Sequence, residues 1–131
     1  MKIRTFHFLL VVFIGFFSLK SNAQDPNWSV NPSNYQFSAT YTTFLNVFGD
    51  NLNNTNDKVA AFVNGEIRGV GNLVYVASAD KYVAYLTVYA NTTGESINFK
   101  IYNSLSDTVY NAVQTDTFKV DVNVGSVFQS F

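Results

Sequence analysis

The chain has 131 residues, of which 47% are hydrophobic and 13% charged, and its formal net charge is −1. This length suits one domain, and the scattered charges leave no basic surface for nucleic acid. The absence of cysteine excludes a disulfide framework, so an apolar core alone must stabilise the fold.

The first residues have the pattern of a secretory signal peptide. Basic residues precede an apolar run over residues 8–17, and Ala23 provides a small residue at the expected cleavage point. The run is shorter than the ~20 apolar residues of a membrane-spanning helix. We therefore expect residues 1–23 to be removed and residues 24–131 to form one exported domain, with no membrane span after cleavage, in the periplasm, at the cell surface or in the medium.

Removal of this segment would take away the single histidine, His7, and leave five basic against nine acidic side chains, a formal charge of −4. A chain without imidazole or thiol cannot carry Ser-His-Asp or Cys-His catalysis, and it lacks most zinc and copper ligands. The remaining glutamates, Glu66 and Glu95, fall at predicted turns, where nothing would raise their pKa for glycosidase chemistry. We therefore expect a protein that is not an enzyme.

Apolar and polar residues alternate with period two along much of the chain, which predicts β-strands with one buried side. The alternation is clearest over residues 35–41, 96–102 and 117–124, whereas residues 73–77 and 82–90 are apolar on both sides. Seven or eight short strands at this spacing predict an all-β fold, an antiparallel two-sheet β-sandwich of immunoglobulin-like type. A closed barrel is the second choice.

Two turns set the expected register of the strands. Asn64-Gly65 lies between apolar runs and predicts a tight hairpin with Phe62 opposite Ile67 and Ala61 opposite Arg68. A second turn at residues 91–94 would pair the strand over 82–90 with the strand over 96–102. This hairpin would form a core layer in which Val88, Leu86 and Ala84 lie opposite Ile97, Phe99 and Ile101.

The mature sequence also resembles a β-sandwich module of secreted and surface proteins from Gram-negative bacteria that use type IX secretion. The resemblance is carried by Trp28-Ser-Val-Asn-Pro32 and by Ala61-Phe-Val-Asn-Gly-Glu-Ile-Arg-Gly-Val70, and it extends over nearly all of residues 24–131. Such modules usually lie inside long multidomain proteins and have no agreed activity. The resemblance implies a binding or structural role outside the cytoplasm and supplies no catalytic residues.

The first candidate site is the outer side of the predicted hairpin formed by residues 82–102. The expected register would place two tyrosines beside amide, ammonium and phenol groups, which can stack sugar rings or form a protein interface. The ligand-binding residues predicted in this way are Tyr85, Tyr89, Asn98, Lys100 and Tyr102.

Three further features are weaker candidates. Glu66 and Arg68 would form a structural ion pair, with Asp57 as another possible partner of the arginine. The oxygen-rich loop around Asp50, Asn54 and Asp57 could hold Ca²⁺, although such loops are also common as plain turns. In the type IX resemblance, Asp107-Thr108-Val109 matches a motif glycosylated on threonine, which makes Thr108 a candidate for modification.

Two functions follow from these features. The first is a non-catalytic secreted or cell-surface module that binds an extracellular glycan or a surface protein through the tyrosine-rich side of the sheet. The second is a subunit of an extracellular filament or adhesin, a homo-oligomer built through free strand edges. Neither function requires a cofactor, apart from the possible Ca²⁺.

Overall fold

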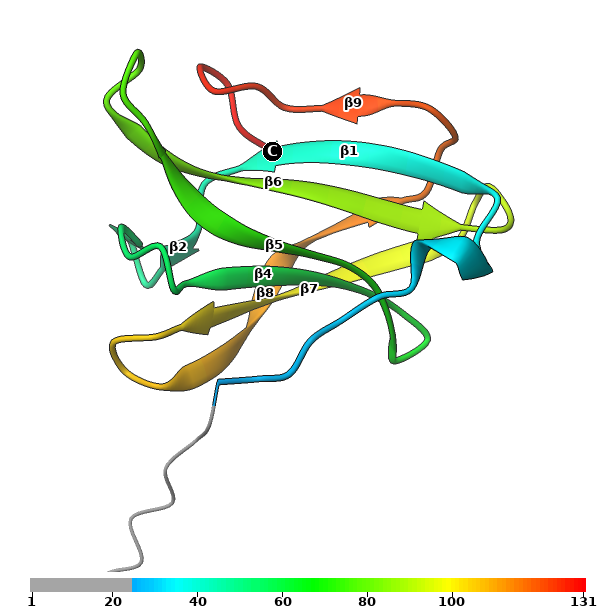
Figure 1. Ribbon diagram of the computed structural model, residues 1–131, viewed down its shortest axis with the longest axis horizontal. Coiled ribbons are helices and arrows are strands. Elements are labelled where there is room, and N and C mark those ends of the chain that lie inside the picture. Colours follow the sequence, from blue (N-terminus) through cyan, green and yellow to red (C-terminus); the bar gives the residue numbers. More distant parts are fainter. Residues whose placement is uncertain (1–24) are drawn as a thin grey trace, which may run out of the picture.

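The structure, a computed structural model, describes residues 25–131, so the predicted signal peptide over residues 1–23 lies outside the described residues. The described chain consists of strands and connecting turns with one short 3₁₀ turn at Pro32–Asn34, which confirms the all-β class (Figure 1). The strands are β1 (Phe37–Thr43), β2 (Asn46–Val47), β3 (Asp50–Asn51), β4 (Lys58–Val63), β5 (Glu66–Val76), β6 (Lys81–Ala90), β7 (Ser96–Asn103), β8 (Thr108–Thr117) and β9 (Asn123–Val124).

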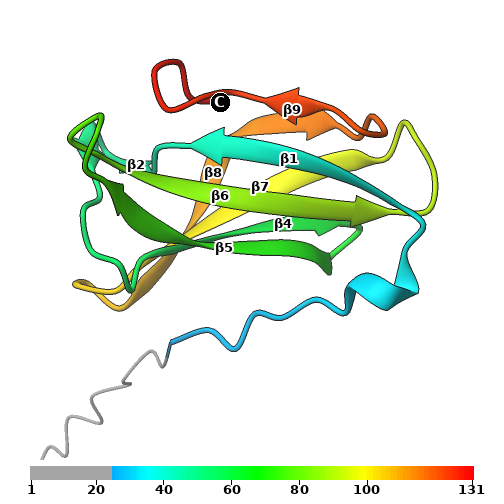
Figure 2. The ribbon, with the colours of Figure 1, turned by 45° about the horizontal axis from the view of Figure 1, so that its top comes forward.

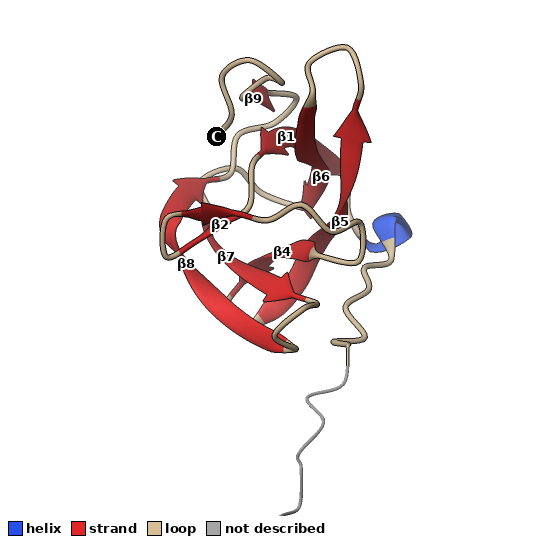
Figure 3. Ribbon diagram, turned by 90° about the vertical axis from the view of Figure 1, so that its left-hand side faces the viewer, coloured by secondary structure: helices blue, strands red, loops and turns tan. Residues whose placement is uncertain are grey.

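Seven strands form one sheet in the order β8-β7-β4-β5-β6-β1-β9, and β2 and β3 form a separate small hairpin. All neighbours in the large sheet are antiparallel except the short parallel pair β1 and β9. Viewed end-on, this sheet curls around the interior (Figure 3). Residues 66–72 of β5 pair with β4 and residues 73–76 pair with β6, so one strand belongs to both halves of the sheet. The more specific expectation of an immunoglobulin-like sandwich with two separate sheets is not confirmed.

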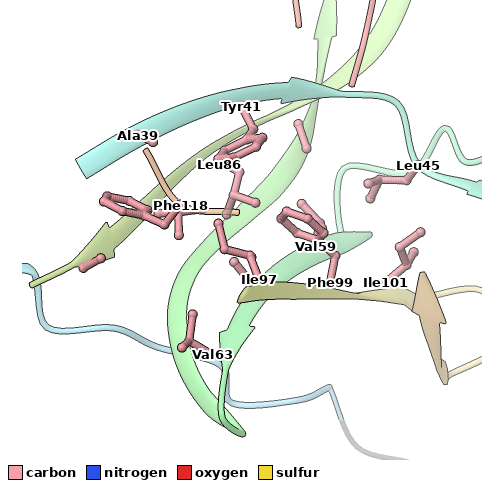
Figure 4. Close-up of a cluster of buried hydrophobic side chains, with 14 of the residues drawn as sticks. Ala39, Tyr41, Leu45, Val59, Val63, Leu86, Ile97, Phe99, Ile101 and Phe118 are labelled. Carbon is pink, nitrogen blue, oxygen red and sulfur yellow. The ribbon is translucent and has the colours of Figure 1, made fainter. Parts of the chain in front are cut away.

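The core lies between the two halves of the curled sheet. Alternate residues of each strand point inward, as the period-two pattern predicts, and they meet at the centre (Figure 4). The buried residues of β1 and β6 face those of β4 and β7: Ala39, Tyr41, Ala84, Leu86, Val88 and Ala90 on one side, and Val59, Ala61, Val63, Ile97, Phe99 and Ile101 on the other.

Two glycines on the inner side of β5 let the halves approach each other. A Cβ atom added at Gly71 would lie 2.6 Å from the carbonyl oxygen of Tyr85, and one at Gly69 would collide with the carbonyl oxygen of Thr87. Only a residue without a side chain fits where two backbones lie this close. Gly69 and Gly71 therefore position β6 over the first half of β5.

The Asn64-Gly65 turn forms the predicted hairpin between β4 and β5. Both residues have positive φ, 50° and 79°, and Phe62 pairs with Ile67 as predicted. The predicted pair of Ala61 with Arg68 is wrong, because a bulge shifts the register and Ala61 pairs with Gly69 instead. The bulge leaves Arg68 as an extra residue and frees its side chain from the cross-strand ladder.

The predicted hairpin between β6 and β7 is wrong. β6 pairs with β1 and β5, and β7 pairs with β4 and β8, so the link over residues 91–95 crosses from one half of the sheet to the other. The predicted core layer is nevertheless present, since the inward residues of both strands are buried. These residues meet across the core, and no hydrogen-bonded ladder joins β6 to β7.

The predicted strand over residues 117–124 is also wrong in its extent. β8 ends at Thr117, the chain turns at Asp121 with φ of 55°, and only Asn123–Val124 return to a strand. Phe118 is buried, and Val120, Val122 and Val124 pack against the core. The alternation correctly marked the buried side chains, but backbone hydrogen bonds from Thr40 and Asp121 connect this segment to β1 without a continuous ladder.

Residues 25–36, called the N-terminal segment below, precede β1 in an extended path along the outer side of the sheet near β4 and β5 (Figure 2). Asp25 pairs with Lys58 of β4 at 2.6 Å, and the Trp28 ring packs edge-on against Phe62 at 5.9 Å. Pro26 and Pro32 favour an extended path, and the 3₁₀ turn at Pro32–Asn34 is the exception to it. Over residues 25–131, the chain has no helix with the length and apolar character needed to cross a membrane.

Candidate functional site

Tyr85 and Tyr89 lie on the outer side of β6, where their neighbours come from β1. Register pairs Tyr85 with Thr42 and Thr87 with Thr40, and all four side chains point away from the core because Leu86 and Tyr41 point into it. Tyr85 and Thr40 are both exposed, and 53% of the surface of Tyr85 is accessible. We call this surface the tyrosine–threonine face; it consists of Thr40, Thr42, Tyr85, Thr87 and Tyr89.

The other three predicted site residues lie on the opposite half of the sheet. Asn98 is exposed on β7, and the Lys100 ammonium lies 4.8 Å from the centre of the Phe62 ring. Tyr102 is buried, and its hydroxyl donates a 2.8 Å hydrogen bond to Asp107, which raises the pKa of Tyr102 to about 12. Because β6 and β7 do not pair, the five predicted residues form two groups and do not make one site.

Tyr89 connects the tyrosine–threonine face to a buried arginine. The Tyr89 ring stacks on Tyr35 of the N-terminal segment with 6.3 Å between ring centres, and the Tyr89 carbonyl accepts a 3.3 Å hydrogen bond from Arg68. The guanidinium of Arg68 lies 4.9 Å from the centre of the Tyr35 ring. Tyr35 therefore packs against both Tyr89 and Arg68.

Arg68 is only 8% exposed and binds both glutamates of the described chain. Its two terminal nitrogens donate to the two oxygens of Glu95 at 3.1 and 3.2 Å, and its Nε donates to Glu66 at 3.3 Å. The Tyr35 hydroxyl donates to the other oxygen of Glu66 at 2.7 Å. We call Tyr35, Glu66, Arg68 and Glu95 the arginine cluster; the predicted pair of Glu66 with Arg68 is part of it, and Asp57 is not.

Ionisation in the arginine cluster follows from these contacts. The hydrogen bond from Tyr35, followed by the charge of Arg68, lowers the pKa of Glu66. Burial alone would lower the pKa of Arg68, but the hydrogen bonds and charge of Glu95 outweigh it and raise that pKa. Burial and the bond to Glu66 raise the pKa of Tyr35. The cluster thus favours an ionised Glu66, a charged arginine and a neutral tyrosine at neutral pH.

Asp57, the predicted partner of Arg68 and candidate Ca²⁺ ligand, connects two loops. It is buried, and one carboxylate oxygen accepts from the backbone and hydroxyl of Ser104 at 2.8 and 2.6 Å. The other oxygen accepts from the backbone N–H of Asn54 at 3.1 Å. Asp50 is exposed in β3, and no group of three metal-binding side chains occurs within residues 25–131. Asp57 acts here as an acceptor of protein hydrogen bonds.

Thr108, the candidate for glycosylation, is the first residue of β8. It follows the turn that joins β7 to β8, and its hydroxyl donates a 2.9 Å hydrogen bond to the carbonyl oxygen of Ser106. The side chain is half-buried, and the preceding Asp107 accepts the hydrogen bond of Tyr102. The motif therefore lies at an accessible turn, but its hydroxyl and carboxylate are both engaged within the protein.

The sequence interpretation missed Tyr35 and the threonines as neighbours of Tyr85 and Tyr89. Thr40 occupies a polar position in the alternation over residues 35–41, so its outward direction could be read from the sequence. Its position beside Thr87 could not, because it depends on β1 pairing with β6. Because the predicted partner of β6 was wrong, Asn98, Lys100 and Tyr102 were wrongly placed beside Tyr85 and Tyr89.

Comparison of the chain with protein-family models, with curated proteins and with solved structures found no match. The protein is therefore classified from its own fold and surface. It is an all-β domain built on one curled, mainly antiparallel sheet, and the outer surface of β1 and β6 carries aromatic rings and hydroxyl groups.

Proposed function

We propose that this protein is a non-catalytic, exported module that binds an extracellular glycan through the tyrosine–threonine face. The observation that carries the proposal is the exposed Tyr85 ring, which lies beside Thr42 on a regular pair of strands. An aromatic ring can stack on the apolar side of a sugar, and adjacent hydroxyls can exchange hydrogen bonds with its polar groups. The proposal also includes export of the protein and its similarity to the modules of type IX secretion. It further includes an immunoglobulin-like fold, in which the two halves of the sheet act as the two layers of a sandwich.

The rigidity of the surface supports this use. Tyr85 and Thr87 lie in the middle of a ten-residue strand, where they pair with Thr42 and Thr40 of β1, and Tyr89 is held by Tyr35. A site on paired strands loses little conformational freedom when a ligand binds. The absence of catalysis in this proposal is supported by Glu66, because the bonds from Tyr35 and Arg68 lower its pKa and a general acid needs a raised one.

The test is glycan binding by Tyr85→Ala and Tyr85→Phe variants, measured on an array of β-linked glucose, xylose and mannose oligosaccharides. We expect the alanine variant to lose binding at an unchanged melting temperature, while the phenylalanine variant retains it because the ring remains. Tyr110→Ala, a half-buried tyrosine on β8, is the matched control and should bind normally. Wild-type protein that binds no glycan on the array, or equal binding by Tyr85→Ala, contradicts the proposal.

A second candidate function, a subunit of a homo-oligomeric filament or adhesin, is favoured by the free edge of β8. Among residues 25–131 this ten-residue strand pairs with β7 only, and it contains Val113, which is 95% exposed. Phe48, at the β2–β3 turn, is 90% exposed and packs edge-on against Tyr110 of β8. A free strand edge without lysine or proline can pair with the same edge of a second copy. Light scattering after size-exclusion chromatography tests this function, and a stable monomer at high concentration counts against it.

A further inference from the structure

A concave surface, separate from the tyrosine–threonine face, lies between the β5–β6 turn and the loop that follows β3. The cavity has a volume of about 420 Å³ and is lined by aromatic, amide and charged side chains, among them Phe44, Asn51, Asn53, Asp80, Lys81 and Tyr82. This volume falls within the ~300–1,000 Å³ typical of small-molecule sites. We propose that this cavity binds a uronic acid residue, the carboxylate-bearing sugar unit of an acidic polysaccharide.

Lys81 supplies the group that would recognise the carboxylate. Its ammonium lies 5.3 Å from the centre of the Phe44 ring, and none of the ion pairs among residues 25–131 includes it. By contrast, Lys58 and Arg68 both have carboxylate partners. An ammonium without an acidic partner, inside a cavity of a chain with excess negative charge, is suited to an anionic ligand.

Asp80 supplies an acceptor that is already held in place. The Tyr75 hydroxyl donates a 2.6 Å hydrogen bond to its Oδ1, and the Tyr75 ring packs on Tyr82 with 5.1 Å between centres. Among the described residues no donor is bonded to Oδ2, which leaves this oxygen for a ligand hydroxyl. A carboxylate beside the ammonium favours a ligand that offers hydroxyl donors as well as a negative charge, and fully ionised phosphate or sulfate has no such donors.

The amides and the aromatic ring complete the set of groups needed for a sugar. The Asn51 side-chain oxygen accepts from the Asn46 amide at 3.0 Å, so the Asn51 NH₂ group remains available as a donor. Asn53 is exposed at the same cavity, and Tyr82 offers a half-buried ring for stacking. Carboxylate recognition by Lys81, hydroxyl recognition by Asp80 and the amides, and stacking on Tyr82 together fit a uronic acid better than a neutral sugar or a simple anion.

The experiment is titration of the ¹⁵N-labelled protein with galacturonic acid and glucuronic acid oligomers, with the matching neutral galactose and glucose oligomers as comparison. We expect backbone amide shifts around residues 51–53 and 80–82 with the acidic sugars, and binding at least about tenfold weaker with the neutral ones, as loss of a charge-assisted hydrogen bond implies. Equal binding of both kinds, shifts produced equally by sodium sulfate, or no shifts at these residues overturn the proposal.

Two variants connect the binding to the named groups. Lys81→Gln should remove the preference for acidic sugars, and Asp80→Asn should weaken binding of all sugars while it lowers the preference less. Lys119→Gln, at an exposed lysine outside the cavity, is the matched control and should bind as the wild type does. Retention of the preference by Lys81→Gln contradicts the proposal.

The outcome is independent of the tyrosine–threonine face. Tyr85 is not among the residues that line the cavity, and Tyr82, three residues away on β6, lies on the opposite side of the strand, although Lys81 lies on the same side as Tyr85. Tyr85→Ala should leave uronate binding unchanged, and Lys81→Gln should leave any binding of neutral glycans at Tyr85 unchanged. The two sites can therefore fail or succeed separately.

Discussion

Arg68 is the residue whose environment departs most from what its sequence position implies. It lies two residues after the exposed Glu66 in a strand, a place where an arginine commonly extends into water, yet it is buried against Tyr35 and bonded to Glu95 from the β6–β7 link. The bulge in β5 explains this placement, because an extra residue leaves the regular ladder there. Three segments distant in sequence therefore depend on one side chain.

Replacement of Arg68 should be costly for stability. Arg68→Met keeps the apolar stem but leaves Glu95, whose side chain is 23% exposed, without its bidentate partner. Breaking a fully buried pair costs ~3–5 kcal/mol, and partial exposure of Glu95 lowers our expectation to about 1–3 kcal/mol. Urea unfolding measures the change. Lys58→Met breaks the pair with the more exposed Asp25 and should cost no more than about 1 kcal/mol; equal losses in the two variants would contradict the role given to Arg68.

Glu66 makes the free energy of unfolding depend on pH in the acidic range. Its pKa is lower in the folded protein than the ordinary value of 4.5, because Tyr35 donates to it and Arg68 lies beside it. The stabilisation is thus complete above pH 4.5 and is lost as the pH falls through the lower, folded-state pKa. We expect Glu66→Gln to flatten the acid limb of a plot of unfolding free energy against pH. A variant with the same acid limb as the wild type would show that the bonds to Glu66 contribute no pH dependence.

At the scale of the elements, β5 matters most because it bonds to both halves of the sheet. Its first seven residues pair with β4 and its last residues pair with β6, and the two inward glycines lie where β6 approaches. A long strand that changes partner midway lets one sheet curl onto itself. The curl in turn brings Tyr41 and Leu86 opposite Phe99 in the core (Figure 4).

Gly71→Ala tests this role of β5. The added methyl group would meet the carbonyl oxygen of Tyr85 at 2.6 Å, so the backbones must separate, and we expect a loss of about 1–3 kcal/mol in the free energy of unfolding. Asn72→Ala, at the exposed neighbouring position, should change stability by less than about 0.5 kcal/mol. Thermal unfolding followed by circular dichroism measures both. A neutral Gly71→Ala would mean that β6 can move away without cost.

Considered as a whole, the molecule has one core that both halves of the sheet share and that Phe131 packs against, while the N-terminal segment lies on the outer side of the sheet. Phe131 packs against Tyr41 and Phe99 at 5.2 and 5.5 Å, and its backbone N–H donates to Thr42 at 3.0 Å. At the other end, the N-terminal segment is fixed by Trp28 on Phe62 and by Asp25 on Lys58. Because the chain has no cysteine, these noncovalent contacts alone hold Phe131 and the N-terminal segment against the sheet.

This arrangement predicts a single cooperative unfolding transition. Trp28 is the only tryptophan of the chain, so its fluorescence reports on the N-terminal segment, while far-ultraviolet circular dichroism reports on the strands. We expect the two signals to change at the same urea concentration, because Trp28 and Tyr35 of the segment pack against side chains of the sheet. A fluorescence change well before the loss of strand signal would show that the N-terminal segment detaches on its own.

The sequence by itself determined the all-β class, the tight turn at Asn64-Gly65 and most of the side chains that point inward. These properties follow from period two and from positive φ at two residues, both of which are local. The correct burial of Val88 and Ile97, despite the wrong pairing of their strands, shows how far local pattern reaches.

Only the tertiary structure decided which strands are neighbours, and therefore which surface residues lie together. The alternation of apolar and polar residues shows whether a side chain points toward the core or toward the solvent. It does not show which strand lies beside it, because the same alternation is compatible with any neighbouring strand. The choice of β1 and β5 for β6 depends on contacts between distant segments, such as the close approach of Gly71 to Tyr85 and the reach of Arg68 to Glu95. For this reason Tyr85 lies beside Thr42, and Lys100 lies on the other half of the sheet over Phe62.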